Sequence, residues 1–520
     1  MLRNLKRALS GAAAATALLA VSAVPASAAA PVGAYTIKGA WSYVSAPKLH
    51  PPKLHTDRPT ASAQLSPGYL FVSNFKNLLY SKPLTGEGGP LILDSRLQPV
   101  WFDPIGTNTF ANNLRVQTYQ GKPALSWWEG IITNTGATTS GSLYVVDQHY
   151  RPIGKPLSGA DGWIITQHEA LIQGHDAWVT AVKNEPMDLS AYGGSPTGTL
   201  LNSAVQEYDL HTGALLYTWD AAPDGIQPGH IPLSDSYTKP APNPAMPWDA
   251  YHINAIQLVR GGFITTMRNT WSAYDVDLKS GATVWTLGGK HSKFALSAGA
   301  QFEWEHDVEM HSGGIVTVFD DNCCAILGPG QLGPPNGSAR ALVIKLNNGN
   351  HTASLVSQYS RGIDVGFQGN AQLQPNGDMV VGWGSQPLIS EFSKSGKLLL
   401  DAVFPSPDLS YRAYVAKWVG TPFFPPTGAA RNHNGRSTVY ASWDGATQVV
   451  AWRVLAGAGA RQLRVVAGRS KTGFETSIAL STRYKTFKVQ ALDAKGHVIG
   501  TSKAFAVPRP NAKQNPPGFY

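Results

Sequence analysis

Cysteine, charge and long apolar runs are all scarce in this sequence. Its 520 residues include 2 cysteines, Cys323 and Cys324, which are adjacent. Adjacent cysteines cannot join distant segments of the chain, and a thiolate metal site needs further cysteines that the sequence lacks. We therefore expect the fold to depend on its hydrophobic core, and neither on a disulfide framework nor on a structural zinc ion.

Charged residues make up 14% of the chain, with 42 Lys and Arg, 33 Asp and Glu, and a formal net charge of +9. The basic residues form no dense run, so the sequence gives no support to nucleic acid as a partner. The small excess of positive charge is compatible with anionic small molecules as ligands.

The first 28 residues have the pattern of a secretory signal peptide. Arg3, Lys6 and Arg7 precede an apolar stretch at 8–24, and Ala26-Ser27-Ala28 has the small residues of a cleavage site. A membrane anchor is the alternative, but the apolar stretch is short and mostly alanine. No later segment has about 18 uninterrupted apolar residues. We therefore predict a secreted protein, extracellular or associated with the cell envelope, without stable membrane insertion.

Apolar and turn-forming residues are abundant. Hydrophobic residues account for 43% of the chain, which also holds 53 glycines, 37 prolines and 15 tryptophans. This composition excludes global disorder and is typical of an all-β protein with many short strands.

A loose unit of short strands and Gly, Asn, Asp or Pro turns repeats between residues 65 and 405. Its marker is an apolar strand that ends near a polar residue, and the six copies lie at Asp94, Asp147, Asp209, Asp275, Lys345 and Glu391. Six copies of a four-stranded unit predict a six-bladed β-propeller, because each sheet buries its faces only against its neighbours. An array of β-sandwiches is the alternative, but it gives no reason for one signature to recur.

The sequence pattern changes near Gly420. Residues 421–426 are rich in proline and typical of a linker, and residues 436–507 alternate like the strands of a small immunoglobulin-like or fibronectin-like sandwich. The predicted parts are a signal peptide at 1–28, an N-terminal extension at 29–64, a six-bladed β-propeller at 65–420, a linker at 421–435, a β-sandwich at 436–507 and a tail at 508–520.

A second repeat lies out of phase with the first. Its units begin with a polar residue, cross an apolar stretch and turn at Gly or Asn; they start at His168, His252, His306 and Asn370, with a poorer copy at Asn113. Equivalent positions of successive propeller blades are related by rotation about the central channel, so the three histidines should converge there.

Converging imidazoles permit three kinds of chemistry. They can ligate a metal ion, act as nucleophile and acid–base catalysts, or bind an anion together with an arginine. Arg268 follows the second strand of the His252 unit and is placed to reach the same end of the channel. Glu169 and Asp307, which follow His168 and His306, are placed to orient an imidazole ring in any of these sites. The spacing alone does not separate the three.

Several segments carry motifs of a known family. They are Tyr251-His252-Ile253-Asn254, Met267-Arg268-Asn269, Gly288-Gly289-Lys290, Phe302-Glu303-Trp304-Glu305-His306-Asp307, Gly369-Asn370-Ala371-Gln372, Gly382-Trp383-Gly384, Ser410-Tyr411-Arg412-Ala413-Tyr414 and Trp418-Val419-Gly420-Thr421-Pro422. Together they resemble the arylsulfotransferase family, in particular its actinobacterial branch. The resemblance covers about residues 60–425, and such proteins carry a similar C-terminal sandwich.

The resemblance implies a six-bladed propeller that moves a sulfuryl group between phenols without a nucleotide sulfate donor or a cofactor. It implies that His306 is the histidine that is transiently sulfated. His252 and Asn254 match the family's His-x-Asn pair, with Asn254 as a substrate-binding residue. Arg268 falls near the family's arginine, and His168 matches its first active-site histidine.

Elementary chemistry agrees with these roles. Sulfuryl transfer resembles phosphoryl transfer, in which positioning and electrostatic stabilisation dominate, and a neutral imidazole is a good nucleophile near pH 7. Arg268 and Asn254 carry N–H groups that can donate to sulfuryl oxygens. Trp127, Trp128 and Trp383 are candidates for walls around an aromatic substrate, although packing within the blades is the simpler interpretation for each of them.

The sequence therefore predicts a secreted aryl-sulfate sulfotransferase with small-molecule partners, a phenolic sulfate donor and a phenol acceptor. Two alternatives remain at this point. One is a metal-dependent propeller enzyme with His168, His252 and His306 as ligands, and the other is a non-catalytic propeller that binds phenolic or sulfated ligands.

Overall fold

The computed structural model describes residues 38–56, 64–76, 82–106, 108–133, 138–222, 231–329 and 331–508. The predicted signal peptide at 1–28 lies outside these residues, as do parts of the predicted N-terminal extension and nearly all of the predicted tail. None of the helices in this part of the chain is long and apolar enough to cross a membrane.

The described chain is all-β, as its composition predicts. Six sheets each contain four antiparallel strands, and two of these sheets carry a fifth strand at one edge. The helical segments described are single 3-10 turns at Ser190–Tyr192, Leu233–Asp235, Arg268–Thr270 and Ser312–Gly314.

In the first three sheets the strands follow one another along the chain, except for β28 in the first sheet. The first sheet contains β28 (Asp408–Ala416), β2 (Tyr69–Lys76), β3 (Gly89–Leu93) and β4 (Pro99–Phe102). The second contains β5 (Phe110–Tyr119), β6 (Lys122–Ile132), β7 (Thr138–Asp147) and β8 (Leu157–Ser158). The third contains β9 (Ile164–Gln173), β10 (Asp176–Met187), β11 (Gly198–Asp209) and β12 (Leu215–Asp220). The late strand β28 thus completes the earliest sheet.

The next three sheets have the same order. The fourth contains β13 (Ile253–Val259), β14 (Gly262–Met267), β15 (Ser272–Asp277) and β16 (Thr283–Gly288). The fifth contains β18 (His306–His311), β19 (Ile315–Asp320), β22 (Arg340–Asn347) and β23 (Thr352–Tyr359), with β17 (Ala295–Leu296) added. The sixth contains β24 (Asn370–Leu373), β25 (Met379–Gly382), β26 (Leu388–Phe392) and β27 (Leu398–Val403), with β1 (His55–Thr56) added. Two further short strands, β20 (Ile326–Gly328) and β21 (Gln331–Leu332), pair as a small antiparallel hairpin.

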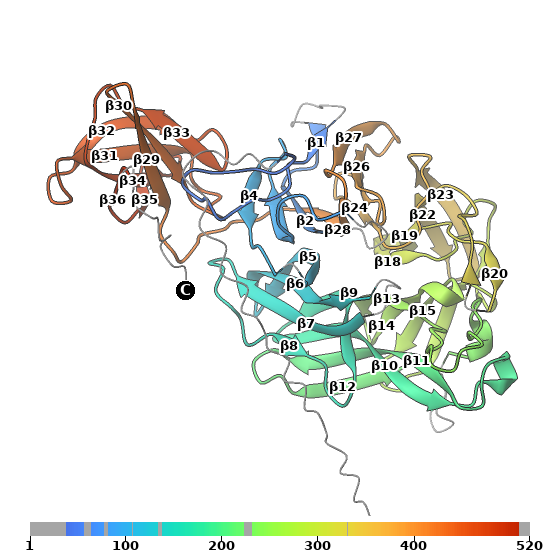
Figure 1. Cartoon of the computed structure of the whole chain (residues 1–520). Coiled ribbons are helices and arrows are strands. Elements are labelled where there is room, and N and C mark those ends of the chain that lie inside the picture. The colour runs from blue at the N-terminus through green and yellow to red at the C-terminus, as the bar shows by residue number, and fades with distance from the viewer. Residues whose placement is uncertain are drawn as a thin grey trace, which may run out of the picture. The chain divides into compact units, whose positions relative to one another are not determined.

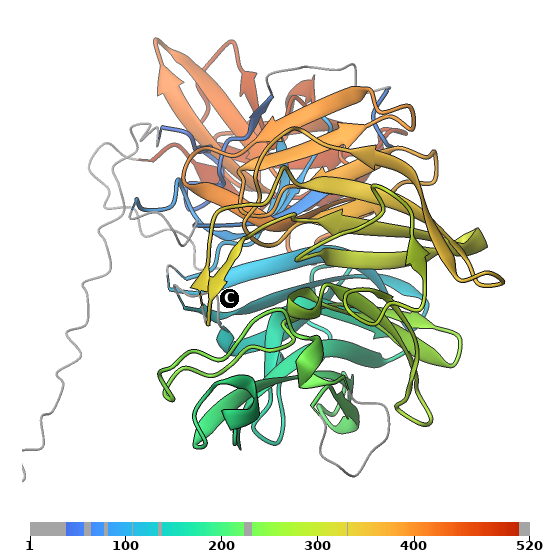
Figure 2. The ribbon, with the colours of Figure 1, turned by 90° about the vertical axis from the view of Figure 1, so that its right-hand side faces the viewer.

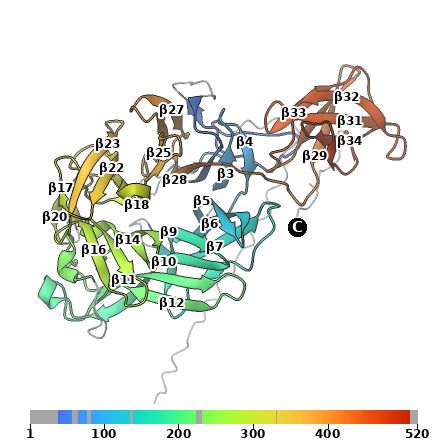
Figure 3. The same cartoon turned by 180° about the vertical axis from the view of Figure 1, so that it is seen from behind.

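The two repeats in the sequence mark two positions in these sheets. The markers of the first repeat lie in, or directly after, the third strand of every sheet: β3, β7, β11, β15, β22 and β26. The residues that start the units of the second repeat lie in, or directly before, the first strands β5, β9, β13, β18 and β24. Figure 1 shows the sheets following one another around a common centre, where the labels of the first strands gather, and Figure 3 shows the same order from behind.

Each sheet is buried on both faces because neighbouring side chains of a strand point to opposite sides. Phe71 and Val72 are adjacent in β2, yet Phe71 packs against the second sheet and Val72 against the sixth. In the same way Val318 of β19 faces the fourth sheet and Phe319 faces the sixth. Six separate apolar clusters join the successive pairs of sheets, including the sixth with the first. In Figure 2 the third to sixth sheets, green to orange, lie one above another in chain order.

Amide side chains link each of several first strands to the next. Gln117 of β5 donates to the carbonyl oxygen of Ala170 in β9 at 2.7 Å, and Gln257 of β13 donates to Met310 in β18 at 2.8 Å. Asn370 of β24 donates to the carbonyl oxygen of Ala413 in β28 at 2.8 Å. The first strands also contact one another in order, from β5 through β9, β13, β18, β24 and β28 back to β5.

The C-terminal strands have a core of their own. One sheet contains β29 (Thr427–His433), β30 (Arg436–Ser442) and β33 (Glu475–Ala479). The other contains β31 (Ala451–Gly457), β32 (Arg464–Ser470), β34 (Thr486–Leu492), β35 (Val498–Thr501) and β36 (Phe505–Ala506). Trp452, Val454 and Val489 are central to the apolar cluster between them.

Hydrogen bonds tie the segment before β29 to the second sheet. The backbone N–H groups of Thr421 and Phe423 donate to the carbonyl oxygens of Gln148 and His149, at 2.9 and 3.1 Å. The Tyr150 hydroxyl donates to the carbonyl oxygen of Gly445 at 2.8 Å. The proline-rich segment therefore lies against the preceding sheets along a defined path.

Candidate active site

The three histidines predicted from the second repeat lie together at the centre of the six sheets. His168 lies in β9, His252 directly precedes β13, and His306 begins β18. The rings of His168 and His252 are 5.2 Å apart in an edge-to-face arrangement. The ring of Tyr411, from β28, lies edge-on to His168 at 5.8 Å and to His306 at 6.3 Å. The first strands thus bring residues from distant parts of the sequence into one cluster.

β-Bulges explain how consecutive residues of one strand can both face this centre. The pairing register shifts between His306 and Glu309, and between Ile253 and Ala255. It shifts also within Ile165–Ala170 and within Asn112–Arg115. An extra residue in a strand breaks the strict alternation of side chains and redirects one of them, and such bulges are common beside active sites.

The backbone around the cluster is also unusual. His252, Trp304 and Asp307 have φ of 57°, 60° and 54°. Residues other than glycine rarely adopt this left-handed region, and positions of this kind gather at sites where the surrounding structure fixes a side chain for function. Of these three residues, His252 is also one that the repeat identifies, and Asp307 directly follows another, His306.

His306 is held by a buried carboxylate. Its Nδ1 lies 2.8 Å from Oδ2 of Asp321, which follows β19, and both side chains are almost fully buried. Nε2 therefore faces away from Asp321. Burial lowers the pKa of His306 well below its ordinary value, and the positive charge of Arg268 acts in the same direction. The imidazole is consequently neutral at pH 7.

His252 has a similar partner but is more accessible. Its Nδ1 lies 2.5 Å from Oδ2 of Asp249, and the two side chains are 26% and 30% exposed. A histidine whose Nδ1 is paired with a carboxylate presents its Nε2 to whatever approaches from solvent. His252 is thus the member of the cluster that solvent reaches most readily.

His168 is buried and lies 3.0 Å, through Nδ1, from the hydroxyl oxygen of Thr166. Burial lowers the pKa of His168 well below its ordinary value, and the charges of Arg268 and Arg412 contribute. His168 therefore also stays neutral at pH 7.

Arg268 supplies the positive charge beside the histidines. It begins the 3-10 turn after β14, and its backbone N–H donates to the carbonyl oxygen of His252 at 3.1 Å. Its guanidinium donates to Asn269 Oδ1 at 3.1 Å and to the carbonyl oxygen of Gly366 at 3.2 Å, and it lies 4.7 Å from the ring of Trp304. We call His168, His252, His306 and Arg268 the histidine layer.

Asn254, for which the family resemblance implies a substrate-binding role, makes one contact within the protein. Its Nδ2 donates to the carbonyl oxygen of Glu305 at 2.8 Å, and the side chain is fully buried. The amide group thus links β13 to the segment before β18, like the amide links between other first strands. This contact uses one of the two N–H donors of the amide, and the substrate-binding role of Asn254 stays a prediction.

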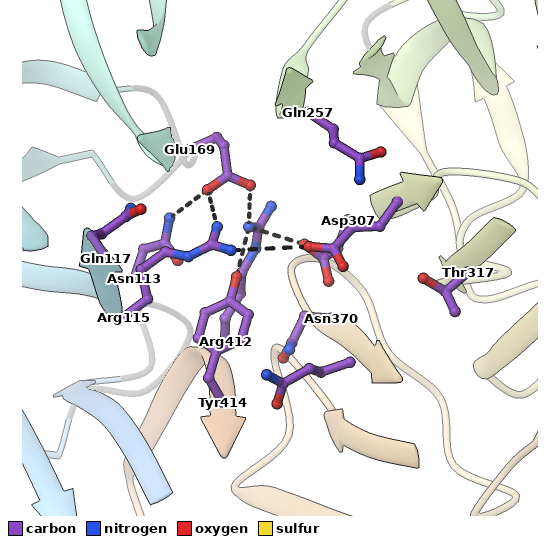
Figure 4. Close-up of polar contacts among 12 residues, drawn as sticks. Asn113, Arg115, Gln117, Glu169, Gln257, Asp307, Thr317, Asn370, Arg412 and Tyr414 are labelled. Atoms are coloured by element: carbon purple, nitrogen blue, oxygen red, sulfur yellow. Dashed lines mark hydrogen bonds and ion pairs between the residues drawn. The ribbon is translucent and has the colours of Figure 1, made fainter. Parts of the chain in front are cut away.

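A network of ion pairs lies beside the histidine layer. Arg412 Nη1 is 2.7 Å from Glu169 Oε2 and 3.1 Å from Asp307 Oδ1, and Arg115 Nη1 is 2.6 Å from Glu169 Oε1 (Figure 4). We call Arg115, Glu169, Asp307 and Arg412 the ion-pair layer. The two arginines overcome the effect of burial and lower the pKa of Glu169, whereas burial raises the pKa of Asp307.

The tryptophans proposed as substrate walls are packed within or between the sheets. Trp127 stacks on Tyr144, and Trp128 Nε1 donates to the carbonyl oxygen of Ile165 at 2.9 Å. Trp383 is fully buried, and its Nε1 donates to the Ser390 hydroxyl. The packing interpretation is therefore the correct one for these three.

Other aromatic residues lie closer to Arg268. Trp271 is edge-on to Trp304 at 5.4 Å and stacks on Tyr237 at 3.5 Å, and Trp271 and Tyr237 are both partly exposed. Cys323 and Cys324 form a disulfide that packs against Trp304. The adjacent cysteines thus join no distant segments, as the sequence predicts, but they lie beside the histidine layer.

The histidine layer does not have the tight spacing of a preformed metal site. Among the described residues, the cluster whose ligand atoms all lie within 4.8 Å of one another is His175, Asp176 and Asp209, beyond the far end of β9 from His168. Asp209 already accepts hydrogen bonds from the backbone N–H groups of its own turn.

The family model for arylsulfotransferase (ASST) matches residues 115–405, more than half of the sequence. The chain belongs to the arylsulfotransferase family. The match contains His168, His252, Asn254, Arg268 and His306, and it ends before Arg412 and the C-terminal strands. No curated protein matches this arylsulfotransferase-family chain.

Solved structures resemble the arylsulfotransferase-family chain only distantly. A protein of unknown function from Bacteroides caccae has 11% identity over 67% of this chain and 98% of its own, with a TM-score of 0.39. A periplasmic gluconolactonase from Pseudomonas aeruginosa has 11% identity over 80% of this chain and 99% of its own, with a TM-score of 0.34. Structural similarities this weak give no information about the activity of this chain.

Sequence reasoning missed three polar residues of the site. Asp249 holds His252 and Asp321 holds His306. Arg412 joins the carboxylates that directly follow His168 and His306. Asp249 is three residues before His252, and that spacing was a usable signal. Asp321 reaches His306 across the pairing of β18 with β19, and Arg412 reaches its partners in other sheets, and spacing along one sequence reveals neither contact.

Proposed function

We propose that the protein is a secreted aryl-sulfate sulfotransferase that works through a sulfohistidine intermediate on His306, without a nucleotide sulfate donor. The observation that carries the proposal is the setting of His306. It is buried, its Nδ1 is paired with Asp321, and it lies in one cluster with Arg268 and two further imidazoles. Membership of the arylsulfotransferase family supports the reaction class.

In the first step the Nε2 lone pair of His306 forms a bond to the sulfur of an aryl sulfate. The bond between that sulfur and the aryl oxygen breaks, and the phenolate leaves with the electron pair. His252, paired with Asp249 and open to solvent, gives the phenolate a proton from Nε2. The sulfated imidazole carries positive charge on its ring, and Asp321 stabilises this charge through Nδ1–H.

In the second step a phenol acceptor gives its proton to His252 and its oxygen bonds to the sulfur. The bond between the sulfur and His306 Nε2 then breaks, and the neutral imidazole returns. Because one group serves both as acid and as base, the histidine layer ends the cycle in its starting protonation state.

In this scheme Arg268 stabilises the negative charge of the transition state. Charge is spread over the peripheral oxygens of a loose sulfuryl transition state, by analogy with phosphoryl transfer, so a fixed cation beside those oxygens lowers the barrier. The guanidinium is held over Trp304 and next to Gly366, and its orientation is thus set before substrate arrives. His168 completes the site as a second neutral imidazole.

The architecture that accompanies this function is a six-bladed β-propeller, with the first strands around its channel. The cyclic contacts of the first strands and the six apolar clusters between successive sheets support it. We further propose that strands β29 to β36, which begin at Thr427 and not at the predicted residue 436, form an immunoglobulin-like or fibronectin-like sandwich. We also propose that residues 1–28 are a signal peptide and that the chain belongs to the actinobacterial branch of the family.

A colorimetric assay with a nitrophenyl sulfate donor and a phenol acceptor tests the function. We expect nitrophenol release that depends on the acceptor and parallel-line kinetics when both substrates are varied, because a covalent intermediate separates the two half-reactions. A protein that binds the donor but releases no nitrophenol would be a ligand-binding propeller. Transfer that is lost on chelation and restored by added metal would indicate the metal-dependent alternative.

A further inference from the structure

Arg412 is a fully buried arginine in β28 that contacts all three of the strand segments that carry the histidines. We infer that Arg412 is a positioning residue, which fixes the distances between His168, His252 and His306. The inference rests on the proposed function, because it concerns the geometry of the same site.

Three contacts carry the inference. Arg412 Nη1 lies 2.7 Å from Glu169 Oε2 and 3.1 Å from Asp307 Oδ1. Arg412 Nη2 donates to the carbonyl oxygen of Asn254 at 2.8 Å. A single guanidinium thus binds side chains of β9 and β18 and the backbone of β13, and Figure 4 shows Glu169 above it and Asp307 to its right.

The partners of Arg412 are close neighbours of the histidines in sequence. Glu169 directly follows His168, Asp307 directly follows His306, and Asn254 is two residues after His252. The bulges in these strands turn the histidine and its neighbour toward the same centre. A displacement of any of the three partners therefore moves a histidine by a similar distance.

The chemistry of the contact requires an arginine. A planar guanidinium presents several N–H donors in a fixed fork, whereas the lysine ammonium is a point charge on a flexible stem. Arg115 occupies Glu169 Oε1, so Oε2 faces Arg412. The Tyr414 hydroxyl accepts a further hydrogen bond from Arg412 Nη1 at 2.9 Å. The arginine is thus oriented by partners on both sides.

The test compares two variants of this network with a matched control. Arg412→Lys keeps the charge and removes the fork. The triple variant Arg412→Gln, Glu169→Gln, Asp307→Asn removes the charges together, which avoids leaving buried carboxylates unpaired. The control, Arg361→Lys, alters an arginine paired with Asp401 of β27 at 2.8 Å, outside the histidine-bearing segments.

The first readout is rapid-quench kinetics with nitrophenyl sulfate alone. The burst amplitude counts active sites, and its rate constant reports sulfuryl transfer to the enzyme. We expect both network variants to keep the amplitude and lose about 10- to 100-fold in rate constant, because small displacements of reacting groups have effects of this size. The control should keep both. A variant with lower amplitude and an unchanged rate constant would show that Arg412 only stabilises the fold, and the inference would be wrong.

The second readout does not require turnover. In protein labelled with ¹⁵N-histidine, the ring nitrogen signals of His168 and His306 should shift in Arg412→Lys and stay in place in Arg361→Lys. Unchanged signals in Arg412→Lys would overturn the inference even if the protein transfers sulfuryl groups normally. Shifted signals in a protein that transfers none would support the positioning role and count against the proposed function instead.

Discussion

The histidine layer and the ion-pair layer share two strands, where Glu169 follows His168 and Asp307 follows His306, but they use their polar groups differently. Glu169, Asp307 and Arg412 bind one another and are fully enclosed. The imidazoles of His252 and His306 are each held through Nδ1 by an aspartate, so their Nε2 atoms face away from these carboxyl groups. Under the proposed function, the ion-pair layer sets the distances between the histidines and the histidine layer carries out the reaction.

Removal of the nucleophile should give the largest effect. We expect His306→Ala to lower transfer by about 10⁴-fold or more, as the loss of a nucleophile does in other enzymes. Far-ultraviolet circular dichroism should show an intact fold. The control is His497→Ala, which removes an exposed histidine of the C-terminal strands that is also paired with an aspartate. Transfer that survives in His306→Ala would assign the nucleophile to another residue.

Asp321→Asn should give the next largest effect. The amide is nearly the same size as the carboxylate, but it cannot stabilise a positive imidazole and does not fix the same tautomer. We expect transfer to fall by about 10²- to 10⁴-fold, in line with the same change in serine protease triads. Asp493→Asn, which removes the partner of His497, is the control and should have no effect on the nitrophenyl assay. Full activity in Asp321→Asn would show that the Asp321 carboxyl group has no part in the reaction.

Replacement of Arg268 should have a smaller effect, because the other groups of the histidine layer remain. We expect Arg268→Ala to lower transfer by about 10²-fold, comparable with removing one oxyanion donor. Arg268→Lys should recover part of this loss, since it restores charge without the fork. If Arg268→Ala transferred at the wild-type rate, the guanidinium would have to lie away from the sulfuryl oxygens.

The smallest effect concerns the stability of the protein at acid pH. Burial lowers the pKa of His168, so below about pH 6.5 the unfolded chain takes up a proton that the folded protein refuses. The stability of the wild type relative to His168→Gln should therefore fall as the pH is lowered from 7 to 5, by at most about 1.4 kcal/mol per pH unit. Urea unfolding of both proteins measures it. If the difference in unfolding free energy between the two proteins stayed constant with pH, the imidazole of His168 would have to be charged or exposed in the folded protein.

The sequence predicted the parts of the site that repeat. The strand markers and the positions of His168, His252 and His306 follow from periodicity, because each blade-like unit must present the same strand at the same place. The contacts between units do not repeat. Arg412 pairs with Glu169 across 243 residues, and Asp321 reaches His306 only because two strands are aligned with a bulge. Such partners are fixed by tertiary packing and leave no spacing signal.

The role of Asn254 shows the limit of reasoning from a motif. The motif identified an asparagine two residues after a histidine, and the structure has that asparagine at the expected strand. However, the same amide is suited both to bind a sulfuryl group and to link two strands, and its contact with Glu305 is of the second kind. A residue type alone does not distinguish a ligand contact from a structural link.

Rapid-quench mass spectrometry with donor alone tests the central claim most directly. Nitrophenyl sulfate is mixed with the enzyme, the reaction is stopped within the first turnover, and the peptides are mapped at alkaline pH. We expect one added sulfuryl group, on the peptide that contains His306, and we expect it to disappear when phenol is added before the quench. An adduct on another peptide, or turnover with no adduct at any time, would contradict the assignment of His306 as the nucleophile.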